Sequence, residues 1–592
     1  MSAPSSVDAA GEGAKAPKAV VRQSGITSVV ATVGVLSGLV LDLVWTSITG
    51  FGARSDAFAL ALRLPLAITA IAMVVANQVL VPTFGAWLTR MEGRERGRAM
   101  AAVMVASAAA SLALALVFAF FAYPLMGMMA PGLDESTIQL AADFTKVLAW
   151  FIPCVILAEV LRSWLNANLV IGFPAAMTLV LNAVAVGFLL LGTAVADSER
   201  LMLIPWAYVA GSLVQLLAMA VAAVVKGWRP ARPDFRHPEV RHTLRLFSRP
   251  TLAASLNPLV RIVEVFVGSE LSKGTVTALH YGNRLASAVG GTIIFRSIMV
   301  TVLPRISRAW ARQDIPAFRS MTRLGLRLMF LLAVPMTILG VVLAPPLCDL
   351  VFGRMPKFDA HTVTLMGVLM ALYSLSFAGS GIQRALLAPF YAMRDTRTPL
   401  LNTIYGIVAN IALIFILDLA IGHTDRAVWL FPIAYSASQY VNVAHGWWRM
   451  RSVEGLQRLP LTLPLAGSLV SGLAGGSVAW LILRFAPGDL SAVVTILATT
   501  AGLGVSAAVA LLAFKAGSRG RGGIPNQQPD TVTALAAADH TPDTLASGEQ
   551  EDLHVSTTTH LSRSPKHSIR SLSITMPALL KSIHWSSPVP TN

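Results

Sequence analysis

Three arginines lie inside long apolar segments of the sequence and have no acidic residue three or four positions away: Arg63, Arg284 and Arg296. An arginine at the centre of a bilayer is costly, so such residues usually face a protein interior or a watery cavity. Arg284 and Arg296 are twelve residues apart. On one helix this corresponds to about 18 Å along the axis, so both side chains can border one cavity. Guanidinium groups bind phosphate and pyrophosphate through paired, charge-assisted hydrogen bonds. The three arginines therefore predict a cavity for an anionic group; the alternative is a scatter of structural arginines.

Other charged residues in apolar segments have an oppositely charged neighbour three positions away. Residues at this spacing lie on the same face of a helix, so each pair can neutralise itself. The pairs are Asp143 with Lys146, Glu159 with Arg162, and Arg261 with Glu264. The last pair opens the second half of the chain, which should face a central cleft. Arg261 is therefore also a candidate to bind the anion, and Glu264 a candidate to couple or gate its movement.

Asp42 has no basic residue within one helical turn. Three interpretations are open for it: a pair with an arginine of another helix, a site for a driving proton or sodium ion, or a position at the outer interface. No HExxH, Walker, GxSxG or paired-carboxylate motif occurs, which indicates that the chain is not an enzyme. Cys154 and Cys348 lack metal-ligand spacing, and no cofactor is expected.

The elements that must position these residues are transmembrane helices. The chain has 592 residues, of which 55% are hydrophobic and 13% charged, and its mean hydropathy is +0.65. A segment of about 20 apolar residues crosses a bilayer as a helix. The fourteen apolar segments cover roughly residues 24–49, 57–88, 99–129, 139–166, 171–195, 201–225, 250–270, 275–303, 324–350, 362–391, 399–421, 427–446, 461–485 and 489–514. The sequence therefore predicts an all-α polytopic membrane protein.

The net charge of +16 follows the predicted topology. With the N-terminus inside, the cytoplasmic loops and the tail residues 15–22 and 515–521 hold 28 Lys and Arg, and loops on the outer side hold six. This asymmetry obeys the positive-inside rule and places both termini in the cytoplasm. It also removes the reason to expect a nucleic-acid partner. The first 23 residues lack an apolar core and are therefore expected to be a cytoplasmic tail rather than a signal peptide.

The sequence contains an internal repeat in which matching residues are 221 to 228 positions apart. The matching pairs are Arg63 with Arg284, Pro82 with Pro304, Trp87 with Trp310, Arg162 with Arg384, Pro174 with Pro399, and Asn182 with Asn410. Each unit spans six helices, an even number, so the two repeats are parallel. Transporters built from such repeats bind their substrate between the two halves near the midplane and work by alternating access.

The repeat divides the chain into lobes, linkers and tails. The predicted parts are a cytoplasmic tail (1–23), an N-lobe of six helices (24–225), a basic cytoplasmic linker (226–249), a C-lobe of six helices (250–446), helices 13 and 14 (447–516), and a disordered cytoplasmic tail (517–592). The last part is rich in Ser, Thr, Pro and Asp, a composition typical of disorder.

Four stretches resemble one known family, the lipid II flippases of the MurJ/MviN type. They are GFGARSDAFALALRLP (50–65), YGNRLASAVGGTIIFRSIMVTVLPRISRAWARQD (281–314), LRLMFLLAVP (326–335) and PFYAMRDTRTPLL (389–401). The family belongs to a superfamily that includes multidrug antiporters and polysaccharide exporters. The resemblance implies a cationic central cavity for a polyprenyl-pyrophosphate-linked cell-wall precursor, with helices 13 and 14 forming a groove for the lipid tail.

The resemblance also implies roles for single residues. Arg284 matches the family's helix-8 arginine, Asn283 the polar position before it, and Thr277 a small hydroxyl position one or two turns earlier. Asp56 matches the acid of the DAF motif and is thereby a candidate for coupling or gating. Arg63 matches the basic residue of the RLP motif, and Asp42 matches the acid that ends the helix-1 pattern.

The sequence departs from the family at four positions. Helix 1 of the family typically reads S-R-x-x-G-F-x-R, with two arginines in the cavity. Val35 and Leu41 stand at those arginine positions, and only the glycine, Gly38, is retained. Leu66 replaces the asparagine that usually follows RLP, and Ser287 replaces an acid often found after the helix-8 arginine. Charge in the cavity must then come from other helices.

Arg261 and Arg296 are the candidates to supply that charge. The resemblance implies a flippase that moves lipid II from the inner to the outer leaflet of the bacterial plasma membrane for cell-wall synthesis. Its partners would be the lipid-linked glycan, membrane lipids and cell-wall synthesis enzymes, and its energy would come from protons, sodium ions or the membrane potential. The alternatives are another polyprenyl-linked oligosaccharide as cargo, a multidrug or cation antiporter, and a non-transporting cell-wall scaffold. A basic cavity argues against an antiporter of cations.

Overall fold

The computed structural model describes residues 33–519 with the exception of 35, 193–196, 230, 272, 290–291, 356, 423–424, 458, 460 and 486–490. Throughout the described residues the chain is predominantly helical and forms no β-strand. The predicted tails, 1–23 and 517–592, lie outside the described part of the chain, except that residues 517–519 end the last helix.

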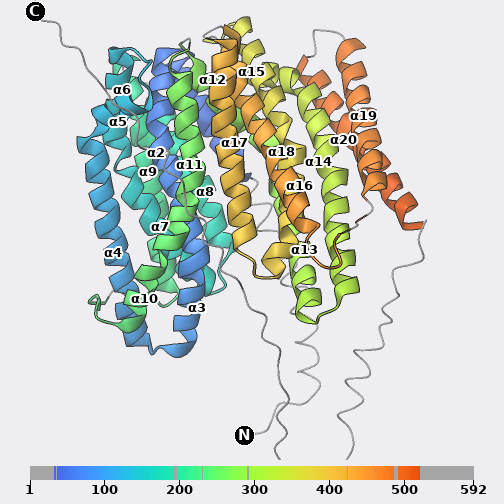
Figure 1. The fold of residues 1–592 in the computed structure, drawn as a ribbon. Coiled ribbons are helices and arrows are strands. Elements are labelled where there is room, and N and C mark those ends of the chain that lie inside the picture. Colours follow the sequence, from blue (N-terminus) through green and yellow to red (C-terminus); the bar gives the residue numbers. More distant parts are fainter. Residues whose placement is uncertain are drawn as a thin grey trace, which may run out of the picture. The chain divides into compact units, whose positions relative to one another are not determined.

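The first half of the chain forms the helices that run from blue to teal in Figure 1. They are Leu36–Thr49, α2 (Ala53–Val75), the π-helix η1 (Ala76–Leu80), α3 (Val81–Arg90), α4 (Gly93–Phe120), α5 (Ala122–Met129), α6 (Glu135–Leu148), α7 (Phe151–Ala167), α8 (Gly172–Leu191) and α9 (Asp197–Val225). The turn before α2 depends on glycine, because φ is +75° at Gly50 and +130° at Gly52. This turn reverses the chain, so helix Leu36–Thr49 and α2 run side by side.

The second half forms the green to red helices. They are α10 (Pro238–Leu246), α11 (Ser248–Gly268), α12 (Thr275–Val289), α13 (Thr292–Ala311), α14 (Ile315–Phe352), α15 (Ala360–Ser374), α16 (Ser376–Ala392), α17 (Arg397–Ile421), η3 (Asp425–Trp429), α18 (Leu430–Met450), α19 (Thr462–Phe485) and α20 (Ser491–Arg519). Aspartates cap several helix starts by accepting a backbone N–H bond. Asp314 does so for α14 and Asp359 for α15.

The described residues of each of the fourteen expected segments lie mainly in helices. Eleven helical stretches are long and apolar enough to cross a membrane. The other three segments correspond to helix Leu36–Thr49, to α12 with α13, and to α18. The predicted all-α polytopic fold class is therefore confirmed.

Several segments that were expected as single helices are divided. A π-helix, in which each turn holds an extra residue, separates α2 from α3. The segments at 139–166 and 362–391 each form two helices, α6 with α7 and α15 with α16. Arg284 lies on α12 and Arg296 on α13, and residues 290–291 between these helices lie outside the described residues. The expectation that one continuous helix carries both arginines therefore stays a prediction.

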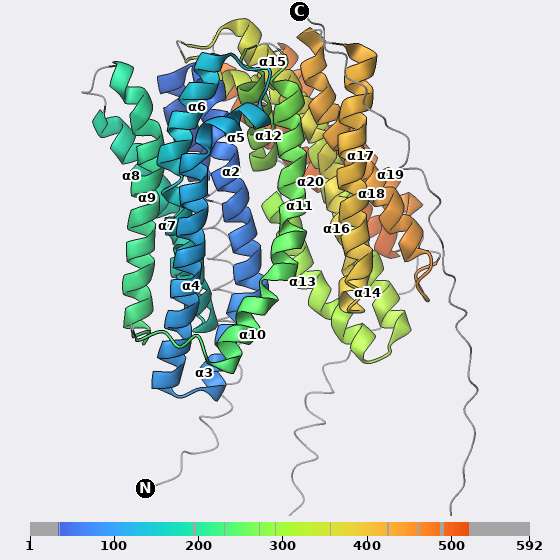
Figure 2. The same ribbon diagram turned by 60° about the vertical axis from the view of Figure 1, so that its left-hand side comes forward.

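The two halves meet along a narrow set of helices. Figures 1 and 2 show α2–α9 on one side and α13–α18 on the other, with α19 and α20 packed against α14. Helices α11 and α12 of the second half contact α2 of the first. Buried aromatic rings strengthen this junction: Trp45 stacks on Tyr281 with ring centroids 5.6 Å apart and lies 4.8 Å from Phe58. Residues matched by the sequence repeat and buried charged residues therefore both lie at the interface between the halves.

Candidate functional site

A cavity of about 410 Å³ lies between the two halves, bordered by α2, α11 and α12. Its polar lining residues are Arg63, Arg261, His280, Asn283, Arg284 and Ser287. Four of the six predicted anion-binding residues therefore lie together: Arg63, Arg261, Asn283 and Arg284. The fifth, Arg296, lies on α13, and its side chain is outside the described part of the structure.

Helical periodicity explains why these residues share the cavity. On α2, the lining positions Ala59, Arg63, Ala67, Ala70 and Val74 recur every three or four residues, which defines one face of a helix. His280, Asn283, Arg284 and Ser287 do the same on α12, and Ala254, Pro258, Arg261 and Ile262 on α11. Each helix therefore presents one face to the cavity, and that face carries its arginine.

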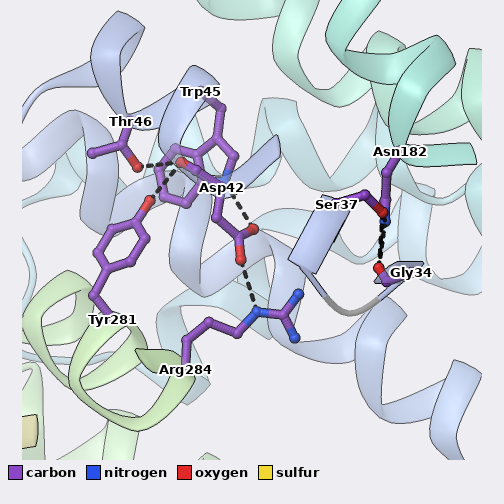
Figure 3. A network of polar contacts seen from close by, with 8 residues as sticks. All are labelled: Gly34, Ser37, Asp42, Trp45, Thr46, Asn182, Tyr281 and Arg284. Atoms are coloured by element: carbon purple, nitrogen blue, oxygen red, sulfur yellow. Dashed lines mark hydrogen bonds and ion pairs between the residues drawn. The ribbon is translucent and has the colours of Figure 1, made fainter. Parts of the chain in front are cut away.

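Arg284 is held by an acid from the first half of the chain. Its Nε donates to the Oδ2 of Asp42 over 2.8 Å, as Figure 3 shows. Trp45 donates to the other carboxylate oxygen of Asp42 over 3.3 Å, and the Tyr281 hydroxyl donates to the Asp42 backbone carbonyl over 3.0 Å. The expectation of three unpaired guanidiniums is therefore wrong for Arg284. Pairing with an arginine of another helix was one of the three interpretations of Asp42.

Gly38 makes room for this arginine. A Cβ atom at Gly38 would lie 2.6 Å from a terminal nitrogen of Arg284, so only glycine allows the observed position of the guanidinium. Leu41, at one of the positions where the family has an arginine, is 1% exposed and belongs to the apolar core. Val35, at the other position, lies outside the described residues.

Arg63 and His280 each hold a buried nitrogen without a partner. The Nε of Arg63 and the Nε2 of His280 form no hydrogen bond with any described residue. Buried polar groups are normally hydrogen-bonded, because an unpaired one loses its hydration without compensation. His280 was missed in the sequence, where only its position one turn before Arg284 indicated that it shares the face. Both residues line the cavity, so an anion there would lie beside their side chains.

Arg261 binds Glu264, its neighbour one helical turn away. Its Nη1 lies 3.0 and 2.7 Å from the two oxygens of the carboxylate, and its guanidinium lies 5.0 Å from the ring centroid of Tyr435. Glu264 is 1% exposed. Of the two interpretations for this pair, the structure shows mutual neutralisation, although Arg261 still borders the cavity. The predicted pairs Asp143–Lys146 and Glu159–Arg162 are confirmed at 2.8 and 3.2 Å.

Asp56 and Thr277 join the two halves instead of lining the cavity. The carboxylate of Asp56 accepts hydrogen bonds from the backbone N–H of Gly274 (2.5 Å) and of Thr277 (2.8 Å) and from the Thr277 hydroxyl (2.6 Å). Asp56 is 1% exposed and Thr277 is fully buried. The expectation that Thr277 contacts the anion is therefore wrong for this conformation, because Asp56 already occupies its donors. An acid of the first half thus caps the N-terminus of α12.

Further contacts join the halves at the same end. The Ser269 hydroxyl accepts the Gly132 N–H over 3.2 Å, Lys273 lies 3.4 Å from Asp134, and Lys357 donates to the Ile48 carbonyl over 2.6 Å. This end carries α6, α12 and α15 and is the upper one in Figure 1. The halves are therefore closed together there.

A second hollow is apolar and lies on α14 and α20. It has a volume of about 530 Å³, and its walls include Leu331, Pro335, Ala507 and Leu511. At one end Arg327 donates to the carbonyls of Ala513 and Phe514 and covers the Phe514 ring. This groove has the character of a site for a hydrocarbon chain.

The family model and the similar proteins carry the same family description. The family model described as "Lipid II flippase MurJ" matches residues 46–499. A lipid II flippase MurJ of Burkholderia cenocepacia is 27% identical over 376 residues, which are 62% of this chain and 72% of the relative. A probable lipid II flippase MurJ of Rhizobium meliloti is 24% identical over 475 residues, 75% of this chain and 84% of the relative.

Solved structures show the same fold. A lipid II flippase MurJ in an inward closed conformation superposes with a TM-score of 0.69 at 18% identity and covers 83% of this chain and 98% of its own. A transporter of the MOP superfamily from Pyrococcus furiosus gives a TM-score of 0.54 at 14% identity, with 73% and 96% of the two chains covered.

Proposed function

Because the chain belongs to the lipid II flippase family MurJ, we propose that it moves lipid II across the plasma membrane of a bacterium. Lipid II is a peptidoglycan precursor in which a sugar–peptide headgroup is linked to a polyprenyl chain by pyrophosphate. The observation that carries the proposal is the cavity between the halves, where Arg63 and His280 hold unpaired nitrogens beside Arg284. These groups suit a pyrophosphate, which arginine binds with charge-assisted hydrogen bonds.

Binding of the pyrophosphate competes with Asp42 for Arg284. When the guanidinium turns to the anion, the Asp42 carboxylate remains buried without its counter-ion, which is strongly unfavourable. A proton or a sodium ion then restores neutrality at Asp42. This exchange links cargo binding to ion uptake and is our proposal for coupling; Glu264, which Arg261 neutralises, is the second candidate. The membrane potential is the alternative source of energy.

Gating follows from the contacts at the closed end. Positive charge concentrates on the loops at the opposite end, so the closed end faces outward and both termini lie in the cytoplasm. Release of lipid II to the outer leaflet then requires α12 to separate from Asp56, followed by closure on the cytoplasmic side. The apolar groove of α14 and α20 supports the proposal, because it can hold the polyprenyl chain while the headgroup crosses.

The other candidate functions are not favoured. A multidrug or cation antiporter needs a cavity that attracts cations, whereas the side chains of this cavity include three arginines. A scaffold for cell-wall synthesis enzymes would not need unpaired buried nitrogens between its halves. Another polyprenyl-linked oligosaccharide would use the same pyrophosphate site, so only cargo-specific assays separate it from lipid II.

Complementation tests the proposal. The wild-type chain is expressed in a strain whose own lipid II flippase can be shut off, together with Arg63→Ala, Arg284→Ala and the control Arg484→Ala, which lies at the end of α19. We expect rescue by the wild type and the control and loss of rescue by the two cavity variants at equal membrane levels. Rescue by both cavity variants would favour a scaffold. Failure of a well-expressed wild type would favour a different lipid-linked cargo.

A further inference from the structure

A third cavity lies inside the C-terminal half, among α11, α13, α16, α17 and α18. Its volume is about 670 Å³, larger than that of the cavity between the halves. The two cavities share Arg261, which borders both. None of the roles assigned above uses this space, which adjoins the proposed pyrophosphate site at that arginine.

Two buried amides in this cavity have unpaired carbonyl oxygens. Asn410 is 2% exposed and Asn442 is 5% exposed, and the Oδ1 of each accepts no hydrogen bond from any described residue. Most buried polar atoms in proteins have a partner. Two buried acceptors without a partner, on residues that line one cavity, therefore point to a ligand that brings hydrogen-bond donors.

The two halves differ at Asn182 and Asn410, which the sequence repeat matches. Asn182 is the counterpart of Asn410 in the first half, and its amide donates to the Ser37 hydroxyl (2.9 Å) and the Gly34 carbonyl (3.3 Å), as Figure 3 shows. There the first helix packs against Asn182 and accepts the hydrogen bonds of its amide. In the second half the corresponding asparagine borders a cavity instead. The same repeated residue thus serves packing in one half and lines a hollow in the other.

The walls of the cavity combine donors, acceptors and aromatic rings. Hydroxyl groups come from Thr403, Tyr391 and Ser438, and amides from Gln383 and Gln439 in addition to the two asparagines. A pyrophosphate alone offers only acceptors, so it would leave Asn410 and Asn442 unsatisfied. Sugar hydroxyls and peptide amides donate and accept, and a few polar groups on largely preformed walls are typical of ligand sites of this size.

We propose that this cavity is the subsite for the sugar–peptide part of the cargo, with the pyrophosphate in the cavity between the halves and Arg261 at the junction of the two. The inference rests on the proposed function, because it assumes a polyprenyl-pyrophosphate cargo. It assigns Asn410 and Asn442 a role in recognising hydroxyl or amide donors of the headgroup.

Binding to the purified full-length protein in nanodiscs tests this assignment. Three ligands are compared: polyprenyl pyrophosphate, the same lipid carrying the disaccharide without peptide, and complete lipid II. Asn410→Ala and Asn442→Ala remove the open acceptors, and the backbone carbonyl of Asn442, which accepts from Asn402, stays in place. We expect each variant to bind complete lipid II about 3- to 10-fold more weakly and bare polyprenyl pyrophosphate unchanged.

Controls separate this inference from the proposed function. Asn182→Ala removes the repeat counterpart and should leave the ratio of the affinities for the two lipids unchanged, and Arg63→Gln should weaken all three ligands. Unchanged binding of bare polyprenyl pyrophosphate by the asparagine variants guards against misfolding as the cause. Equal weakening of bare and complete lipid by the asparagine variants, or no effect on either, would overturn the subsite while an Arg63 effect upholds the pyrophosphate site. If Arg63→Gln also has no effect, the proposed function itself fails.

The disaccharide lipid identifies the part of the headgroup in the cavity. If the asparagine variants weaken both the disaccharide lipid and complete lipid II, the cavity binds the sugars. If they weaken only complete lipid II, it binds the peptide. Both results support the assignment, because both place donors of the headgroup beside Asn410 and Asn442.

Discussion

At the residue scale, the central feature is the guanidinium of Arg284, which has two alternative anionic partners. Arg284 pairs with Asp42 at 2.8 Å and also borders the cavity in which we place the pyrophosphate. The Arg284 side chain is 40% exposed, so its guanidinium is partly hydrated and accessible to a second anion. A pair of this kind can open when a stronger anion arrives. This makes it suitable for exchange between two partners.

Replacing the acid tests this exchange. Asp42→Asn keeps the shape of the side chain but removes its charge, so the anion no longer competes for Arg284. We expect bare polyprenyl pyrophosphate to bind about 3- to 5-fold more tightly, since a partly exposed ion pair contributes up to about 1 kcal/mol. We also expect flipping in proteoliposomes to lose its dependence on a proton or sodium gradient. Weaker binding would show that Asp42 does not compete with the anion.

The glycine beside Arg284 provides a second test at this scale. A Cβ at Gly38 would lie 2.6 Å from the terminal nitrogen of Arg284, the mobile end of a long side chain. Gly38→Ala should therefore displace the guanidinium without unfolding the helix and weaken pyrophosphate binding several-fold. Gly187→Ala is the matched control, because a Cβ there meets nothing within 4 Å. Unchanged binding in Gly38→Ala would mean that the position of Arg284 is not critical.

At the scale of elements, the N-terminus of α12 holds the two halves together by binding Asp56. Its free N–H groups carry partial positive charge, and the Asp56 carboxylate from α2 accepts from Gly274 and Thr277. The Thr277 hydroxyl also donates to the Ser55 hydroxyl over 3.0 Å, and the whole contact is almost fully buried. Opening of the closed end must break it, so its strength sets the balance between the two conformations.

Removing the charge of Asp56 should shift the equilibrium between the closed and open conformations. Asp56→Asn loses a charge-assisted contact worth about 1–2 kcal/mol, equivalent to a roughly 5- to 30-fold change in the equilibrium. Spin labels at positions 135 and 357, both exposed and near the closed end, should then report a larger population at long distance. Asp134→Asn is the control, because its contact with Lys273 is exposed and should contribute little. An unchanged distance distribution would remove the gating role of Asp56.

At the scale of the whole molecule, three hollows of different chemistry are arranged along one chain. A cationic cavity lies between the halves, a cavity rich in amides and hydroxyls lies in the second half, and an apolar groove lies on α14 and α20. The three parts of the cargo differ correspondingly. The pyrophosphate is anionic, the sugar–peptide carries hydroxyls and amides, and the polyprenyl chain is apolar. The correspondence supports one amphipathic cargo that contacts all three.

Filling the groove tests whether the lipid tail contacts it. Ala507→Trp should slow flipping of long-chain lipid II about tenfold by excluding the tail from contacts with α14, while a short-chain analogue is unaffected. Ala508→Trp is the matched control on the neighbouring exposed position, which does not line the groove. Transport in proteoliposomes measures both. Equal rates for Ala507→Trp and the control would show that the tail does not use the groove.

Local features were predictable from the sequence. The apolar lengths indicate the helices, because a bilayer sets how many residues a span requires. The pairs Asp143–Lys146, Glu159–Arg162 and Arg261–Glu264 follow from spacing along one helix. The repeat indicates a transporter built from two parallel units, and the quoted motifs indicate the family. These predictions succeed because each depends on residues close together in sequence or on a pattern carried by the chain itself.

Only the tertiary structure decided which distant residues meet. Asp42 and Arg284 are 242 positions apart, and Asp56 and Thr277 are 221 apart, so no local rule pairs them. His280 gained its role because α12 turns the face it shares with Arg284 toward α2. The cavity around Asn410 exists because helices pack less tightly there than around Asn182, its repeat counterpart. The sequence determined the helices and their charges, whereas packing between helices decided which charges are paired and which polar atoms remain open to a ligand.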